Sequence, residues 1–162
     1  MLKPMALMSC VCAATLCSFP AAAQTASTFE KKTFNYSEWT KGRFSEAVTV
    51  TGPSKMIFLA GVGAEDENGS GGNILYKGDF GAQCKYAYDK IKRLLEKQGA
   101  ELSDVVKVVS YVTDMRYQSD YGKCRSEAFG PTLPAHTLLN VTQLAWPGMM
   151  VEVDVTAVVP LK

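Results

Sequence analysis

Apolar residues follow a helical period in one long segment of the chain, residues 79–99. They recur there every three or four positions, which places one face of a helix against a core. The apolar face consists of Phe80, Cys84, Ala87, Ile91, Leu94 and Leu95. Asp79 is a suitable N-cap for this helix, and Gly99 is a suitable residue for its C-terminal end. The pattern predicts an amphipathic helix whose charged residues face solvent.

Other segments alternate between apolar and polar residues with period two, which predicts strands. The Val-rich segment 102–115 is expected to be a central strand. We expect further strands at 44–50, 55–61, 134–144 and 148–160, and a short edge strand at 30–36. The strands 44–50 and 55–61 are separated by a Gly-Pro-Ser turn, so we expect them to pair as a hairpin.

A second, shorter helix is expected at 119–129, although Gly122 weakens it. The order of strands, helix, strand, helix and strands predicts one α+β domain over 40–162. Its two helices should pack on one face of a mostly antiparallel sheet. The glycine-rich stretch 62–79 between the elements matches no phosphate-binding pattern, so we expect a surface loop there.

The first 23 residues have the pattern of a cleaved secretory signal. Lys3 precedes an apolar run from 5 to 19, and Ala21, Ala22 and Ala23 follow it. The run is shorter than the roughly 20 residues of a membrane-spanning helix. We therefore expect cleavage after Ala23, a short lead at 24–39, and a secreted or periplasmic chain that no longer contacts a membrane. An uncleaved membrane anchor is the main alternative.

Such cleavage leaves only Cys84 and Cys124 in the mature chain. In an oxidising compartment the two cysteines could pair, but sequence gives no distance between them. Two separate thiols, packed as small hydrophobic side chains, are the favoured interpretation. The whole chain has 17 basic and 16 acidic residues, and its basic residues form no block. Its charge therefore gives no reason to expect a nucleic acid as partner.

Several segments together resemble the Rid family, the YjgF-type imine deaminases. They are "GRFSEAV", "MIFLAG", "GDFGAQ", "GAELSDVVKVVSYVTDM" and "PAHTLLNVTQLAWPGMMVEVDVTAV", which span about residues 40–160. The resemblance implies a chorismate-mutase-like α+β fold and a homotrimer with a cleft between each pair of subunits. It also implies hydrolysis of a small enamine or imine to a keto acid and ammonia, without a metal or an organic cofactor.

The family's site residues are only partly present. Glu152 matches the glutamate that orients or activates water, and Gly61 matches the strand-end glycine whose backbone approaches the ligand. Phe44 replaces a tyrosine, Gly122 replaces an asparagine, and His136 replaces the arginine that holds a substrate carboxylate. We expect Glu152 and His136 to be catalytic. The expected ligand-binding residues are Phe44, Gly61, Gly122 and Thr137.

His136 is open to three interpretations. It could face Glu152 as a general acid or base, because an ordinary imidazole titrates near working pH. It could bind a carboxylate weakly, since it lacks the permanent charge and fork of an arginine. It could also be a structural strand residue in a cleft without catalysis. Glu152 and Asp154 lie on one strand face, where they are either solvated or paired at a subunit cleft.

The sequence thus predicts a secreted Rid-type hydrolase whose substrate differs from the usual one. The alternative is a trimer that binds a small metabolite without turning it over. One histidine and two acids form no specific set of metal ligands.

Overall fold

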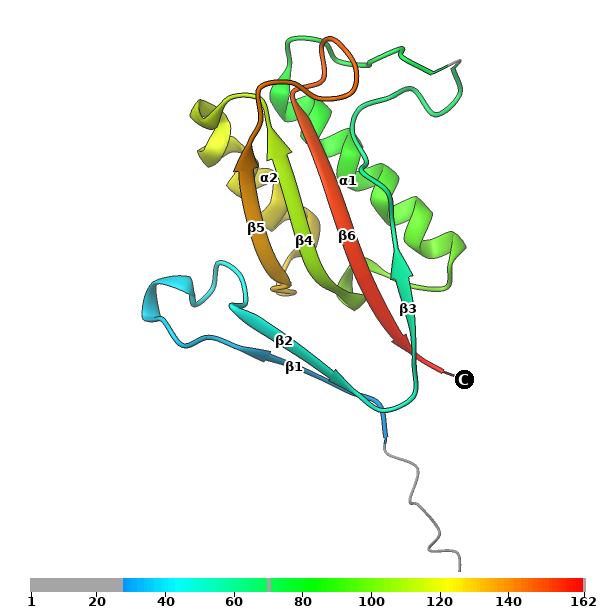
Figure 1. Cartoon of the computed structure of the whole chain (residues 1–162), viewed down its shortest axis with the longest axis vertical. Helices are drawn as coiled ribbons and strands as arrows, with labels where there is room; N and C mark the ends of the chain where they lie inside the picture. Colours follow the sequence, from blue (N-terminus) through cyan, green and yellow to red (C-terminus); the bar gives the residue numbers. More distant parts are fainter. Residues whose placement is uncertain (1–27, 70, 162) are drawn as a thin grey trace, which may run out of the picture.

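The main sheet has four strands in the order β3-β6-β4-β5, and both long helices cover one of its faces (Figure 1). This computed structural model describes residues 28–69 and 71–161. The strands are β1 (Glu30–Phe34), β2 (Ala47–Thr51), β3 (Ser54–Phe58), β4 (Val105–Val112), β5 (Ala135–Asn140) and β6 (Val151–Pro160). The helices are α1 (Phe80–Lys97) and α2 (Gln118–Phe129), with short 3-10 turns at Glu38–Thr40, Leu102–Asp104 and Met115–Tyr117. The predicted α+β fold is confirmed.

The sheet is mostly antiparallel, as predicted, but its β4–β5 pair is parallel. The connection from β4 to β5 runs through α2, as parallel neighbours require. The predicted signal at 1–23 lies outside the described residues. No helix within residues 28–69 and 71–161 is both long enough and apolar enough to cross a membrane.

The predicted hairpin between 44–50 and 55–61 is wrong. β2 pairs with β1 in a separate two-stranded sheet, while β3 pairs with β6. β3 brings the buried Ile57 into the core, whereas no residue of β2 is buried, so only β3 gains by joining the main sheet. The chain leaves one sheet for the other at Gly52. Its φ is +87°, and a Cβ there would lie 2.6 Å from the carbonyl oxygen of Thr28.

The core lies between β6 and α1, where the predicted periodicities are confirmed. Val151, Val153 and Val155 of β6 are buried against the helices. Asp79 caps α1 by accepting a hydrogen bond from the Ala82 N–H, at 3.0 Å. Gly99 follows the helix with a φ of +73°, the conformation that favours glycine at this position.

A disulfide between Cys84 of α1 and Cys124 of α2 joins the two helices. The favoured interpretation of two separate thiols is therefore wrong. Both helices pack side by side on the same sheet face, which brings the two Cα atoms to 6.4 Å, within the range that a disulfide spans. Cys124 directly precedes a residue of the candidate site described below, so the bridge fixes the part of α2 that forms that site.

Replacement of both cysteines by alanine should lower the free energy of unfolding. The bridge closes a loop with a sequence separation of 40 residues. The chain-entropy account then gives a loss of about 3–4 kcal/mol, and a fall in Tm on the order of 10 °C. The measurement is a thermal melt of the Cys84→Ala/Cys124→Ala variant against the oxidised chain, both starting at Gln24. Reductant should destabilise only the parent chain. Two free thiols in the unreduced, denatured parent would contradict the assignment.

Candidate functional site

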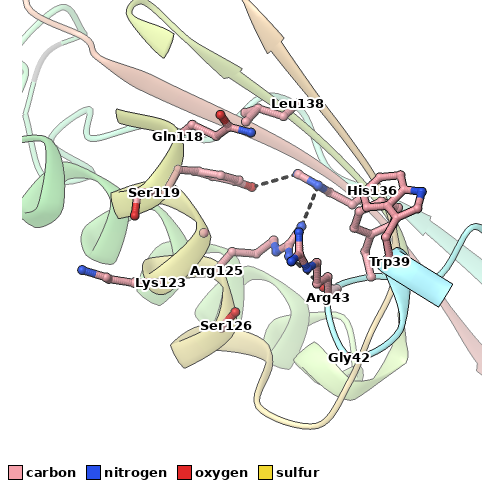
Figure 2. A pocket seen from close by; sticks show the side chains of 13 residues that line it. Trp39, Gly42, Arg43, Gln118, Ser119, Lys123, Arg125, Ser126, His136 and Leu138 are labelled. Atoms are coloured by element: carbon pink, nitrogen blue, oxygen red, sulfur yellow. Dashed lines mark hydrogen bonds between the residues drawn. The ribbon is translucent and has the colours of Figure 1, made fainter. Parts of the chain in front are cut away.

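A cavity of about 610 Å³ opens between the loop before β2, helix α2 and strand β5 (Figure 2). Three residues predicted from the sequence line it: Phe44, Gly122 and His136. Arg125, which sequence reasoning missed, lines it as well. Tyr121 lies one helical turn before Arg125, so the two share a face of α2. The helical period of α2 could therefore have indicated Arg125 as a neighbour of any group packed on Tyr121.

Arg125 and His136 are in direct contact in this cavity. One guanidinium nitrogen of Arg125, Nη1, lies 2.6 Å from His136 Nδ1, and Nη2 donates to the carbonyl oxygen of Arg43 at 2.7 Å (Figure 2). A guanidinium can only donate hydrogen bonds. His136 Nδ1 must therefore accept, and the neutral ring carries its proton on Nε2.

The other side of the His136 ring rests on a buried network of hydroxyl groups. The ring stacks on Tyr121 with centroids 5.6 Å apart, and Nε2 lies 3.4 Å from both Tyr121 Oη and Ser110 Oγ. Tyr121 Oη in turn is hydrogen-bonded to Ser110 Oγ and, at 2.7 Å, to Tyr88 Oη. His136 thus connects the buried hydroxyl groups to the guanidinium in the cavity.

Burial lowers the pKa of His136 to about 3, and the positive charges of Arg125 and Lys107 add to this effect. The imidazole is therefore neutral at pH 7. A catalytic acid or base works best when its pKa is close to the working pH. The pKa of His136 is far below neutral pH, so the histidine is poorly suited to that role. Neutrality suits a different role, because only the neutral ring can accept the hydrogen bond from Arg125.

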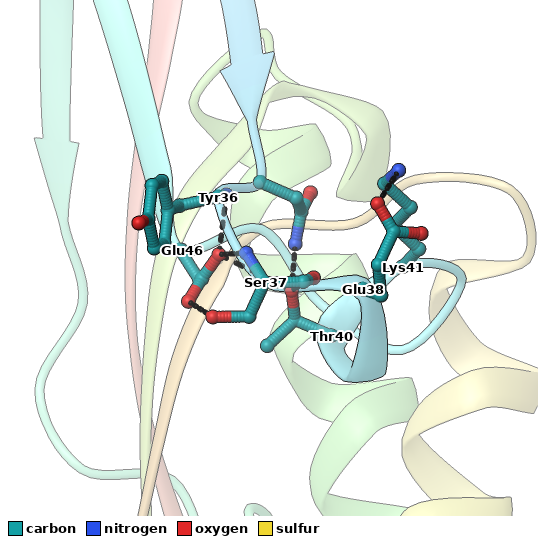
Figure 3. A network of polar contacts seen from close by, with 7 residues as sticks. Tyr36, Ser37, Glu38, Thr40, Lys41 and Glu46 are labelled. Atoms are coloured by element: carbon teal, nitrogen blue, oxygen red, sulfur yellow. Dashed lines mark hydrogen bonds and ion pairs between the residues drawn. The ribbon is translucent and has the colours of Figure 1, made fainter.

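A second network holds the loop before β2, whose residues Trp39, Arg43 and Phe44 line the cavity (Figure 3). The Glu46 carboxylate accepts hydrogen bonds from the N–H groups of Tyr36 and Ser37, at 2.5 and 2.7 Å, and from Ser37 Oγ at 2.8 Å. These bonds to Ser37 and its neighbours hold the pKa of Glu46 below its usual value. Asn35 Nδ2 donates to the carbonyl oxygen of Phe44 at 2.8 Å, which positions the aromatic wall.

Glu152 lies on the other face of the sheet. In the strand register His136 is level with Val108, which is buried under the helices, whereas Glu152 is level with Tyr111 on the open face. Thr137 also lies on the open face, where it accepts a hydrogen bond from Lys107 Nζ at 2.7 Å. The predicted site residues thus form two groups, one on each face of the sheet.

Gly61 belongs to the Glu152 group. A Cβ at this position would overlap Oε1 of Glu152, so glycine lets the carboxylate lie directly against the backbone. Burial raises the pKa of Glu152, and the negative charges of Glu65 and Asp154 raise it further. A carboxyl with a raised pKa can exchange protons nearer to neutral pH than an ordinary one. In the described part of the chain, no cluster of three His, Cys, Asp or Glu residues could hold a metal ion.

Comparisons with known proteins agree with the fold. The family model described as Endoribonuclease L-PSP matches residues 37–159. A RutC family protein of Pyrococcus abyssi is 36% identical over 104 residues, covering 64% of this chain and 76% of the relative. A YjgF/YER057c/UK114 family member of Mycobacterium tuberculosis aligns with a TM-score of 0.54 and 32% identity, over 80% of this chain and 100% of that one. The Rid protein YyfB of Yersinia pestis, at 24% identity, shares the fold with a TM-score of 0.66, over 78% and 97% of the two chains.

His136 is the single histidine of the chain, so its protonation state can be read directly by NMR. With a pKa of about 3, its ring should remain neutral from pH 8 to pH 5, with the proton on Nε2. The measurement is a titration of the 15N and 13C ring signals. An acid-unfolded sample provides the reference for a free imidazole. A midpoint near the ordinary value of 6.5 would contradict the account.

The lowered pKa of His136 also predicts how the free energy of unfolding changes with pH. The unfolded imidazole takes up a proton near pH 6.5, whereas the folded one does so only near pH 3. Protons therefore favour the unfolded state in this window, and the free energy of unfolding should fall as the pH falls from about 6.5 towards 3. Urea unfolding at pH 7 and pH 5 would measure this fall. The His136→Gln variant should lose less stability between the two pH values than the parent chain, and an equal loss would count against the assignment.

Proposed function

Since the chain belongs to the Rid family, we propose that it hydrolyses a small enamine or imine that carries a carboxylate, in a cleft between the subunits of a homotrimer. The observation that carries this proposal is the guanidinium of Arg125 in the cavity. Arg125 offers from α2 the charge that His136 of β5 lacks. The family model is described as an endoribonuclease. This chain has a net charge of +1, which gives little electrostatic basis for binding RNA.

Arg125 is well suited to hold an anion. Its two hydrogen bonds go to neutral acceptors, His136 Nδ1 and the carbonyl oxygen of Arg43. Among the described residues no ion pair involves Arg125. The guanidinium therefore keeps its full charge and further N–H groups for a ligand. Both neutral acceptors also fix its orientation before a ligand arrives, which reduces the entropy lost on binding.

The open face of the sheet gives a reason to expect an oligomer. Three large apolar side chains are exposed there: Met56 at 55%, Phe58 at 70% and Leu139 at 43%. Met56 and Phe58 lie on edge strand β3 and Leu139 on the opposite edge strand β5, with the polar residues of β6 and β4 between them. Large apolar side chains left exposed on a sheet face support a subunit interface there. In the proposed trimer, the open face of one subunit lies against the cavity of the next. Glu152 of one copy can then approach a ligand that Arg125 of another copy holds.

Such a cleft could carry out hydrolysis without a cofactor. Arg125 binds the carboxylate and orients the imine carbon. The Glu152 carboxylate accepts a proton from water as its oxygen adds to that carbon, and the protonated acid then supplies the nitrogen with a proton. The hydroxyl proton of this adduct then moves to the same nitrogen, again through Glu152, as the C–N bond breaks, the C=O bond forms and ammonia leaves. Because Glu152 must begin as a carboxylate, the rate should fall as the pH falls through its raised pKa.

Binding without turnover is the second candidate function. It is favoured by the separation of the two groups, because Glu152 and His136 lie on opposite faces of the sheet in one chain. We also propose that the chain works in an oxidising compartment outside the cytoplasm. The Cys84–Cys124 disulfide supports this location, since such bridges persist mainly in secreted and periplasmic proteins.

Kinetics should separate the roles of the two residues. Arg125→Met should raise KM for 2-imino acids about 30-fold to 150-fold, the equivalent of about 2–3 kcal/mol of charge-assisted hydrogen bonding. Glu152→Gln should mainly lower kcat. The assay follows loss of imines generated in situ by an amino-acid oxidase. Arg116→Met is the matched control, because Arg116 is exposed and paired with Asp114 outside the cavity. Unchanged KM in Arg125→Met would contradict the proposal.

The oligomeric state has its own test. Light scattering of the chain starting at Gln24 should give three times the mass of one chain. Phe58→Glu puts a charge beside Met56 on the open face, so it should shift the mass towards the monomer and reduce hydrolysis with it. Leu161→Glu serves as the control, because Leu161 is also an exposed apolar residue and lies outside the four strands of the main sheet. A monomeric parent chain with full activity would refute the proposed cleft.

A further inference from the structure

The cavity beside Arg125 is large for the smallest imino acids. Its volume of about 610 Å³ falls in the range of about 300–1,000 Å³ that is typical of pockets for drug-sized ligands. A substrate of three or four carbons would leave most of this space to water. In the proposed trimer the neighbouring subunit covers part of this space, and the remainder still leaves room for a ligand with a bulky group in addition to its carboxylate.

Gly122 contributes to this space. It lies inside α2, where glycine lowers helix stability relative to alanine. Its φ is not positive, and a Cβ added there would meet no heavy atom within 4 Å. Neither backbone conformation nor packing requires glycine at this position. The missing side chain does leave the wall of the cavity open, since Gly122 is one of the residues that line it.

The wall formed by the loop is aromatic. Trp39 remains 62% exposed, and its ring packs edge-on against Phe44, with centroids 5.5 Å apart. Phe44 in turn lies 6.1 Å from the His136 ring. Trp39 and His136 lie on the same side of the cavity (Figure 2). An exposed indole next to a cavity offers a face on which a planar ring of a ligand can stack.

The charged residues that line the cavity indicate which group the other end of the ligand carries. Arg43, Lys123 and Arg125 line the cavity, and none of the described residues that line it is acidic. From the volume, the aromatic wall and these cations we infer that the ligand is an aromatic carboxylate. Its ring stacks on Trp39 in the space left by Gly122, and its carboxylate binds Arg125. In the hydrolase proposed above, which this inference extends, the substrate class is then an aromatic 2-imino acid and the product an aromatic 2-oxo acid.

Calorimetry with two product-like probes tests this inference without catalysis. Phenylpyruvate and 2-oxobutyrate carry the same 2-oxo acid group and differ in the ring. The oligomeric parent chain should bind phenylpyruvate at least tenfold more tightly. Trp39→Ala and Gly122→Asn should each reduce this preference to near one, whereas Arg125→Met should weaken both acids. Circular dichroism and a thermal melt establish that each variant is folded, and Gly122→Ala provides a helix-stabilising comparison.

Two further probes separate the ring from the charge. 2-Phenylethanol, with a ring but no carboxylate, and inorganic phosphate, with charge but no ring, should both bind more weakly than phenylpyruvate. Equal affinity for phenylpyruvate and 2-oxobutyrate would overturn the inference, as would a preference that survives Trp39→Ala and Gly122→Asn. Tight, selective binding without imine hydrolysis would refute the proposed function and leave this inference intact. Hydrolysis of imines without a preference for the aromatic acid would support the proposed function and overturn this inference.

Discussion

The hydrogen bond between Arg125 and His136 is the interaction on which the candidate site depends. It joins helix α2 to strand β5, and it exists only while the imidazole is neutral. Burial against Tyr121 and the nearby positive charges keep the ring neutral at pH 7. The disulfide at Cys124, the neighbour of Arg125 in α2, holds the helix against α1. A histidine that is a poor carboxylate ligand by itself thus becomes the acceptor that positions an arginine.

The sheet divides the chemistry into two halves. The helix side offers a cavity with positive charge and aromatic walls, and the open side offers the Glu152 carboxylate beside Gly61. Because strand alternation fixes these faces, no side-chain rotation in one chain can bring Glu152 into the cavity. The proposed hydrolysis therefore requires a second copy of the chain. Ligand binding at Arg125 uses residues of one chain only. The two roles can therefore be told apart, because a change at the subunit interface affects turnover and a change at Arg125 affects affinity.

Much of the fold followed from local patterns. The period of 79–99 predicted α1 together with its cap at Asp79, and the alternation of β6 predicted that Glu152 and Asp154 share one face of the strand. Pairing that depends on distant segments could not be predicted this way. β2 pairs with β1 and not with β3, because only a strand with a buried face is stabilised by joining the main sheet. The turn between the two segments contains no information about that sheet, so it could not predict the pairing. The contact of Cys84 with Cys124 likewise depends on how two helices pack.

The site residues show the same limit. The family resemblance indicated that His136 stands in the place of an arginine. It did not indicate that Arg125 of α2 supplies a guanidinium at the same cavity. Arg125 follows Tyr121 by one helical turn, and only the packing of Tyr121 on the His136 ring turns that spacing into a contact. The separation of His136 from Glu152 depended on the register of three strands, which sequence alone did not fix.

A double-mutant cycle between Arg125 and His136 tests the central claim most directly. Calorimetry would compare phenylpyruvate binding by the parent chain, Arg125→Met, His136→Phe and the double variant. Phenylalanine keeps a ring to stack on Tyr121 but has no acceptor for the guanidinium. If His136 acts by positioning Arg125, the double variant should bind scarcely more weakly than Arg125→Met alone. Losses that simply add would show that the two residues act independently, which would contradict the account.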